Sequence, residues 1–322
     1  MNYLETKIKE LESYLPPLTK RDDFDEFWDN TIKQARQVPL DATLTDVNYP
    51  SPFVKVYELC YHGFDQTPIY GWYLVPAFLK EEKIPCLVNY HGFTGDRGIP
   101  SEFMQWVMMG MAVVSVDCRE QGGKTGNCAH YSNSGLVTNV NSKGILDKNE
   151  YYYRAVYMDC LKALDFAETR PEIDRTRIVI KGVSQGGALG MAVCALDDRP
   201  KAAFLNVPSN SNIEARVEGR NGSFSSVTDY LKKFPQHLEK AYETLSYFDT
   251  MNMADKIRCM VFASVGLNDT TCPAKCYYAS YNRITSPKHI DVYPFNEHDG
   301  AYPIQIEKEL RYLRDYHILD RE

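Results

Sequence analysis

Short apolar segments alternate with helical segments along most of the chain, and this alternation limits the possible folds more than any other feature. The apolar segments have the length and composition of strands that a sheet buries on both faces. They cover residues 85–92, 112–118, 177–184, 202–208, 258–266 and 289–295. The helical segments cover residues 100–110, 152–169, 185–197, 272–284 and 303–316. Strands that alternate with helices form βαβ units, so the sequence predicts an α/β fold with a doubly wound, mostly parallel sheet.

The region before this alternation has two different patterns. Residues 53–62 and 69–75 are rich in β-branched and aromatic residues around a turn-like stretch, which predicts an N-terminal hairpin. Residues 1–48 have a polar, helical pattern, and we expect them to wrap around the body rather than to form a separate domain. The wrap would face the body with three aromatic side chains at helical spacing: Phe24, Phe27 and Trp28.

Residues 1–322 are expected to form one domain, because α/β folds often exceed the average domain length. Two segments are longer than a simple crossover: residues 119–150, rich in Gly, Asn and Ser, and residues 209–255, mostly helical. Long excursions from a compact fold are commonly functional, so we expect these insertions near the functional site or at a subunit interface. Plain surface decoration is the alternative for both.

The charge of the chain excludes several classes of partner. With 36 basic and 43 acidic residues the net charge is -7, so a nucleic acid or an anionic membrane would meet a repulsive field. No apolar stretch reaches the roughly 18 residues that a membrane span needs. Charges interrupt the apolar positions of the N-terminus, which does not resemble a signal peptide. We therefore expect a cytoplasmic protein.

The cysteine pattern indicates reduced thiols without a metal. The nine cysteines are odd in number, and several lie in apolar segments where a thiol acts as a small hydrophobe. Cys272 and Cys276 are four residues apart, but no second pair at zinc-ligand spacing follows them. The sequence therefore predicts neither a metal site nor another cofactor.

The pentapeptide from Gly182 to Gly186 matches G-x-S-x-G, with Ser184 at its centre. The match alone is weak, and a Gly/Ser loop is the alternative. The pentapeptide, however, follows an apolar strand and precedes a helix of small residues. In that setting the serine hydroxyl projects from a tight turn, and the two glycines allow the strand and the helix to approach closely.

A nucleophilic serine needs a base, and the base needs an orienting carboxylate. In a strand-turn-helix setting of this kind the chain order is serine, acid, histidine. Asp269 follows the 258–266 strand and His298 follows the 289–295 strand, at the strand ends where open parallel sheets place their sites. We therefore predict Ser184, Asp269 and His298 as a catalytic triad.

The alternative acids rank below Asp269, because Asp291 lies within a strand and Asp299 adjoins the histidine. The remaining histidines are assigned ordinary structural roles: His62, His91, His130, His237, His289 and His317.

Acyl transfer also needs donors for an oxyanion, and one is the backbone N–H after the nucleophile, here that of Gln185. The second donor comes from the loop after an earlier strand. Residues 91–98 occupy that place, so the N–H of Phe93 is the candidate, with Gly92 and Gly95 giving the backbone room.

These motifs together resemble carbohydrate esterase family 7, the acetyl xylan esterase and cephalosporin-C deacetylase family. The resemblance is carried by FDEFWDNTI, HGFTGDRG, REQGG, GILDKNEYYYRAVYMD, GVSQGG, SVGLNDTTCP and NEHDG. It implies an α/β-hydrolase fold and a serine esterase that deacetylates sugars, xylo-oligosaccharides or cephalosporin-type compounds without a cofactor. It also implies a homo-oligomer, often a hexamer.

For the site, the resemblance implies the same triad and the same two oxyanion donors. It adds Arg119 and Gln121, in the REQGG stretch, as supporting residues beside Gly92, Gly182 and Gly186.

Three positions depart from the family pattern. His298 is followed by Asp299 instead of glutamate, and Pro208 is followed by Ser209 instead of phenylalanine. Glu120 stands where a glycine is expected between Arg119 and Gln121. If that glycine has φ > 0, glutamate would be strained there, so we expect the loop to have rearranged.

Two further functions stay open. A triad does not identify the leaving group, so a peptidase or a thioesterase on the same fold is the enzymatic alternative. A catalytically silent binding protein is the other, and it would require a missing triad member or oxyanion donor.

Overall fold

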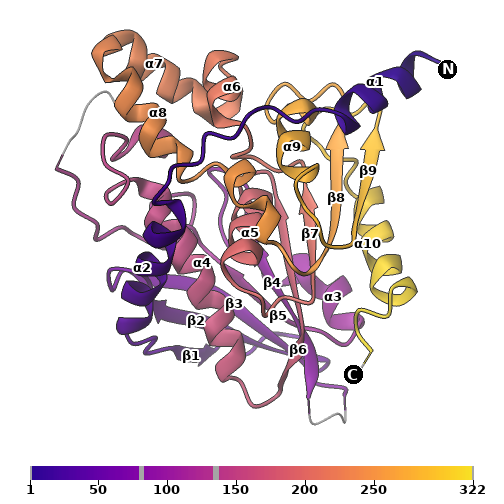
Figure 1. Ribbon diagram of the computed structural model, residues 1–322. Helices are drawn as coiled ribbons and strands as arrows, with labels where there is room; N and C mark the ends of the chain where they lie inside the picture. The colour runs from indigo at the N-terminus through magenta and orange to yellow at the C-terminus, as the bar shows by residue number, and fades with distance from the viewer. Residues whose placement is uncertain (1, 80–82, 133–137, 321–322) are drawn as a thin grey trace.

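The computed structural model describes residues 2–79, 83–132 and 138–320, and its centre is a nine-stranded sheet (Figure 1). The strand order is β1-β2-β3-β5-β4-β6-β7-β8-β9. The first three pairs of neighbours in this order are antiparallel and the remaining five are parallel. The strands are β1 (Thr43–Asp46), β2 (Val54–His62), β3 (Pro68–Pro76), β4 (Ile84–Tyr90), β5 (Ala112–Val116), β6 (Ile173–Val183), β7 (Ala202–Asn206), β8 (Met260–Gly266) and β9 (Lys288–Tyr293).

The predicted doubly wound sheet and its N-terminal hairpin are confirmed. The hairpin is β2 paired with β3, closed by the N–H of Gly63 donating to the carbonyl of Thr67 at 2.8 Å. The prediction that residues 1–48 are helical throughout is wrong at β1, which pairs antiparallel with β2. Its four residues, TLTD, are too few to show a strand pattern next to the helical segment, and the edge of β2 supplies the hydrogen-bond partners.

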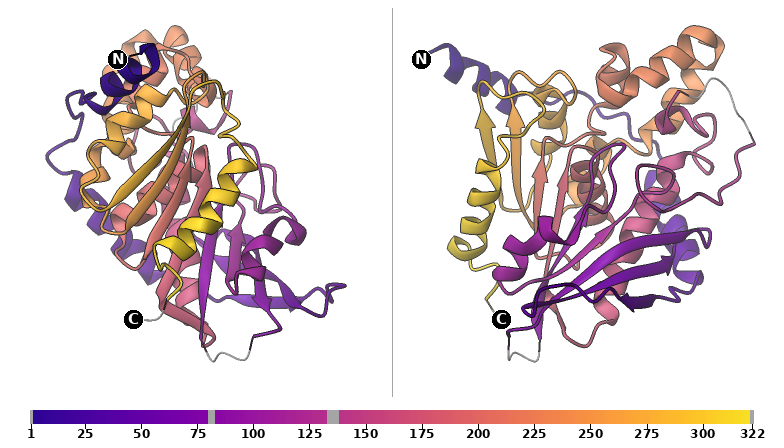
Figure 2. Two further views of the ribbon diagram at one scale, coloured as in Figure 1. Left: turned by 90° about the vertical axis from the view of Figure 1, so that its right-hand side faces the viewer. Right: turned by 180° about the vertical axis from the view of Figure 1, so that it is seen from behind.

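Helices cover both faces of the sheet. The α-helices are α1 (Tyr3–Glu12), α2 (Phe24–Gln37), α3 (Met104–Met108), α4 (Tyr152–Thr169), α5 (Gln185–Leu196), α6 (Ile213–Glu218), α7 (Ser225–Lys233), α8 (Leu238–Ser246), α9 (Ala274–Tyr281) and α10 (Ile304–Asp315). Single 3-10 turns are η1 (Pro100–Phe103), η2 (Val140–Ser142), η3 (Gly222–Phe224), η4 (Pro235–His237), η5 (Thr250–Asn252) and η6 (Ala254–Lys256). Figure 2, in its left view, shows α10 on one side of the sheet and most other helices on the opposite side.

Two hydrophobic cores correspond to these two faces. The larger core joins one face of the sheet to α2, α4, α5 and α9, and the smaller core joins the other face to α3 and α10. Phe24, Phe27 and Trp28 are buried in the larger core, as the helical spacing predicted. The Trp28 indole N–H donates to the carbonyl oxygen of Tyr247 at 3.0 Å, which ties the N-terminal segment to the 209–255 insertion.

The insertions lie at the end of the sheet to which the arrowheads of β7 and β8 point (Figure 1). Residues 209–255 form α6, α7 and α8 with short turns between them. Within the 119–150 segment, residues 133–137 lie outside the described residues. No helix in the described part of the chain is long and apolar enough to cross a membrane.

Candidate active site

Ser184 lies in the tight turn between β6 and α5, with φ 59° and ψ -117°. Non-glycine residues with positive φ are uncommon and strained, and they cluster at functional sites. A Cβ atom on Gly182 would overlap the carbonyl of Gly186, and one on Gly186 would overlap the carbonyl of Tyr90. The two glycines of the pentapeptide are therefore required for the close approach that holds the serine in this turn.

The three predicted triad residues meet at the carboxyl ends of β6, β8 and β9. The Ser184 hydroxyl oxygen lies 2.9 Å from Nε2 of His298, and Nδ1 of His298 lies 2.7 Å from the Asp269 carboxylate. Asp269 has no exposed side-chain surface, and it also accepts hydrogen bonds from the N–H groups of Thr271 and Cys272, both at 2.8 Å. The carboxylate is thus fixed on the far side of the imidazole from the serine.

The two alternative acids bind elsewhere. Asp291 accepts from Lys308 at 2.6 Å and from Tyr312 at 2.9 Å. Burial by itself would raise the pKa of Asp291, but these two contacts hold that pKa below its ordinary value. Asp299 accepts from Asn296 at 2.9 Å. Among the described residues, His298 makes its carboxylate contact with Asp269 and with neither alternative.

Of the two residues with predicted oxyanion donors, Phe93 lines the cavity beside Ser184, and Gln185 directly follows Ser184 in the chain. Within the described residues, neither the N–H of Phe93 nor the N–H of Gln185 donates to a protein acceptor. Gln121 connects the two segments that carry them. Its Oε1 accepts from the N–H of Thr94 at 2.9 Å, and its Nε2 donates to the Gln185 side chain at 2.9 Å. Gln121 therefore fixes the spacing of the two amides without lining the cavity beside the serine.

The loop that carries Phe93 is also held by His91. Nε2 of His91 accepts from the N–H of Cys118 at 2.7 Å, so Nδ1 is the protonated nitrogen that donates to the Gly92 carbonyl at 2.7 Å. Burial lowers the pKa of His91, which favours the neutral ring that this pair of contacts requires. The structural role predicted for His91 agrees with these contacts.

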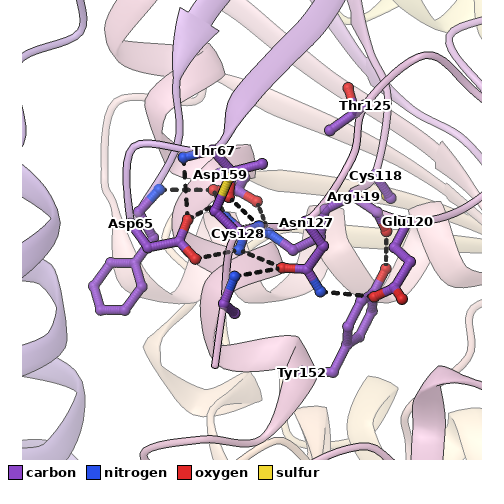
Figure 3. Close-up of polar contacts among 12 residues, drawn as sticks. Asp65, Thr67, Cys118, Arg119, Glu120, Thr125, Asn127, Cys128, Tyr152 and Asp159 are labelled. Atoms are coloured by element: carbon purple, nitrogen blue, oxygen red, sulfur yellow. Dashed lines mark hydrogen bonds and ion pairs between the residues drawn. The ribbon is translucent and has the colours of Figure 1, made fainter. Parts of the chain in front are cut away.

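Arg119, two residues before Gln121, lies in a buried ion cluster with Asp65 and Asp159 (Figure 3). Its guanidinium donates to both carboxylate oxygens of Asp159, at 2.7 and 2.9 Å, and to Asp65 at 2.9 Å. Burial raises the pKa of Asp159, and Arg119 opposes that shift. Tyr152 donates to the Arg119 carbonyl. Arg119 does not line the cavity, so its contribution is to anchor the loop that continues to Gln121.

The expectation of a rearranged loop at Glu120 is wrong. Glu120 has φ 55°, in the left-handed region that favours glycine, so the loop keeps a conformation suited to glycine with glutamate in it. Its carboxylate accepts from Asn127 at 2.7 Å (Figure 3). It also accepts from Lys143 at 2.5 and 2.6 Å. These side-chain contacts lie outside the local sequence pattern and offset the backbone strain.

A cavity of about 400 Å³ opens beside Ser184. Its lining combines predicted residues with others from the 209–255 insertion and the β8 loop: Gly92, Phe93, Val183, Ser184, Ser209, Arg216, Ser223, Thr271, Cys272 and His298. Arg216 and Cys272 were not predicted as site residues. Nothing in the local sequence distinguishes Arg216 from a surface arginine of a polar helix, because only the packing of α6 on the β8 loop buries it.

In the described part of the chain no three His, Cys, Asp or Glu side chains form a group that could hold a metal ion. The nine cysteines are free thiols.

This sheet, with a strained serine between a central strand and its following helix, defines an α/β-hydrolase. Residues 1–316 match the family described as acetyl xylan esterase. The chain belongs to the acetyl xylan esterase family.

Individual relatives agree with the family. The chain is similar to acetyl esterase Axe7A of Xylanibacter ruminicola, with 29% identity over 300 residues that cover 88% of this chain and 65% of that relative's length. The chain thus spans slightly less than two thirds of that curated relative. It also resembles the solved acetyl xylan esterase from Paenibacillus sp. R4, with a TM-score of 0.92, 39% identity, and coverage of 96% of this chain and 99% of that one.

A second solved relative is acetyl xylan esterase 1 from Thermoanaerobacterium sp. JW/SL YS485, with a TM-score of 0.90 and 27% identity. The match covers 96% of this chain and 98% of that one. Acylaminoacyl peptidase of Pyrococcus horikoshii, at 15% identity and a TM-score of 0.57, shares the fold alone.

Proposed function

We propose that this protein removes acetyl groups from O-acetylated sugars through an acyl-enzyme formed on Ser184. The observation that carries the proposal is the continuous contact from the Ser184 hydroxyl through the His298 imidazole to the Asp269 carboxylate, with the serine held in its strained turn. The peptidase and thioesterase alternatives share this geometry, but the family does not favour them.

Each group has one role in the proposed reaction. Nε2 of His298 takes the hydroxyl proton while Ser184 Oγ bonds to the acyl carbon, and Asp269 holds the ring in the tautomer this requires. The carbonyl oxygen becomes an oxyanion that accepts from the N–H groups of Phe93 and Gln185. Collapse breaks the bond to the alkoxy oxygen, which leaves with the proton from the imidazolium. Water then repeats the sequence and releases acetate.

The substrate, location and assembly are part of the proposal. The relatives are named for acetyl xylan, which supports acetylated xylo-oligosaccharides, and the family resemblance adds cephalosporin-type acetyl esters. Free thiols throughout the described chain support a cytoplasmic location. We further propose a homo-oligomer, possibly a hexamer. Light scattering should then give a multiple of 36.9 kDa, and a particle of that single mass would contradict it.

Replacement of the nucleophile tests the mechanism. Ser184→Ala should lower kcat for p-nitrophenyl acetate by about a thousandfold or more, because no group replaces the hydroxyl. Ser101→Ala, at an exposed serine on η1, is the matched control and should keep the wild-type rate. Retention of most activity by a folded Ser184→Ala protein would remove the central claim.

Acyl-chain and leaving-group comparisons test the substrate class. We expect the wild-type kcat/KM to fall steeply from acetyl to butyryl esters. Matched acetyl thioester and peptide amide substrates separate the alternatives, and a faster amide or thioester reaction would favour one of them.

A further inference from the structure

Arg216 places a buried guanidinium on the wall of the cavity that contains Ser184. Its side chain projects from α6, and the residue is 1% exposed. Nη2 donates to the carbonyl of Thr271 at 2.7 Å and lies 3.5 Å from the Cys272 sulfur, while Nη1 donates to the Ser209 hydroxyl. The Cys272 sulfur in turn lies 4.0 Å from the Ser184 hydroxyl. The charge of Arg216 is therefore close to the reacting atoms.

No carboxylate among the described residues pairs with this charge. The protein partners of Arg216 are neutral, and its buried Nε–H donates to none of the described residues. Asp269, the acid of the site, already accepts from His298, Thr271 and Cys272. Arg119 shows the usual arrangement, since two aspartates meet its buried charge. An unpaired buried charge is costly, and a protein retains one mainly where an anion completes it.

The residues around this guanidinium hold it in one position. Ser209, at the position where the family pattern has phenylalanine, offers a hydroxyl that accepts from Arg216. The centroid of the Phe224 ring lies 4.8 Å from the guanidinium carbon. The N–H of Asn212 and the N–H of Ile213, at the start of α6, donate to the buried Asp249 at 2.9 and 2.6 Å. The cation is thus fixed in place before any substrate enters.

We propose that Arg216 makes this cavity selective for acyl esters that carry a carboxylate close to the scissile bond. The inference rests on the proposed esterase function and specifies the substrate class of the same site. A carboxylate on the substrate supplies the counter-charge that the fold lacks, in a cavity where low dielectric strengthens the attraction. The carboxylate belongs either to the acyl group or to the alcohol, for example an acetylated uronic acid.

Two pairs of esters distinguish these sources. Ethyl hemisuccinate against ethyl butyrate varies the acyl side, and acetylated galacturonic acid against acetylated galactose varies the alcohol side. In at least one pair, wild-type kcat/KM should be about tenfold or more higher for the acid, as one charge-assisted contact would give. Equal rates for the acid and neutral members, or preference for the neutral member, in both pairs would overturn the inference, whereas hydrolysis of neither member of either pair would count against the proposed function itself.

Substitutions of Arg216 test whether this residue causes the preference for the acid esters. Arg216→Met should reduce the ratio of acid to neutral kcat/KM about tenfold, and Arg216→Lys should retain part of it. Arg220→Met, at an exposed arginine of the same insertion paired with Asp229 at 2.9 Å, should keep the wild-type ratio. An unchanged ratio in folded Arg216→Met would show that the arginine serves the fold alone.

A binding measurement on the wild type does not depend on turnover or on the folding of a variant. At constant ionic strength, succinate should raise the Tm of the wild-type protein more than uncharged succinamide does, because only the dianion pairs with Arg216. Equal shifts for the two compounds would contradict an anion site.

Discussion

Single residues of this protein hold backbone conformations that their side chains do not favour. Ser184 and Glu120 both have positive φ, at 59° and 55°. The serine conformation follows from the pentapeptide and its flanking elements, so the sequence could predict it. The glutamate conformation depends on Lys143 and Asn127, which lie 23 and 7 residues away along the chain, and no local pattern indicates them.

Substitutions at Glu120 separate backbone strain from side-chain contacts. Glu120→Gly and Glu120→Ala both lose the carboxylate, but only glycine adopts φ 55° without strain. We expect the glycine variant to be more stable than the alanine variant by about 1 kcal/mol, measured by urea unfolding. Because the lost ion pair is partly exposed, Glu120→Gly itself should stay within about 1 kcal/mol of the wild type. Equal stability of the two variants would show that the left-handed conformation costs little.

The choice of triad acid gives a second prediction at this scale. Asp269→Asn should reduce kcat by about 10⁴-fold, because an amide favours the wrong imidazole tautomer. Asp291→Asn changes the same group on β9, away from the imidazole, and should keep kcat within about threefold of the wild type. The rates are measured on protein shown to be folded by circular dichroism. The opposite ranking would move the assignment to Asp291.

Among the elements, the close contacts of α5 with β6 and with the end of β4 hold the turn that carries the proposed nucleophile. Gly186→Ala should lower the free energy of unfolding by about 3 kcal/mol, because its Cβ meets the rigid Tyr90 carbonyl, and activity should fall as the turn shifts. Gly126 has open space around its Cβ position, so Gly126→Ala should change stability by about 0.5 kcal/mol or less. Denaturant titrations of both proteins check the contrast, and a mild effect at Gly186 would mean that α5 can move away from the end of β4 easily.

The start of α6 is held by Asp249, which accepts from the N–H groups of Asn212, Ile213 and Met251. Burial raises the pKa of Asp249 to about 6, so the folded state binds this proton more tightly than the unfolded state. The contribution of Asp249 to stability is then largest at low pH and declines as pH rises to about 6.

The stability difference between wild type and Asp249→Asn should therefore fall by about 1 kcal/mol from pH 5 to pH 7, in urea titrations. Asp291→Asn provides the control of opposite sign. The pKa of Asp291 is lowered, so its contribution is present above the unfolded pKa, stays level from pH 5 to 7, and is lost at lower pH. A difference that grows between pH 5 and 7 for Asp249→Asn would contradict the direction of its shift.

Most elements follow from local pattern, and those that do not depend on neighbours. The helix predicted over 152–169 is α4 with the same bounds, because the periodic apolar positions continue without a break. β1 was not predicted, since a four-residue edge strand takes its conformation from pairing with β2. α6 lies in a segment predicted as mostly helical, but its role in carrying Arg216 to the cavity depends on packing against the β8 loop.

Over the whole molecule, the parallel order of β4 to β9 brings widely separated loops to one edge of the sheet. This is why chain order and positions at strand ends together predicted that Ser184, Asp269 and His298 meet, although Ser184 and His298 are 114 residues apart. The cavity wall is different, because the 209–255 insertion reaches it through a three-dimensional path that no strand order specifies. The sequence therefore indicated the proposed triad residues more completely than the residues of the cavity wall beside them.

The strained turn at Ser184 has a consequence for protein engineering. Alanine at this position would keep the unfavourable backbone angle, whereas glycine would relieve it, and neither would catalyse the proposed reaction. A selection for thermal tolerance alone thus has no reason to retain the serine. Directed evolution of a more thermostable variant of this chain therefore needs a screen for activity at every round. Stabilising substitutions should be sought away from the end of β6.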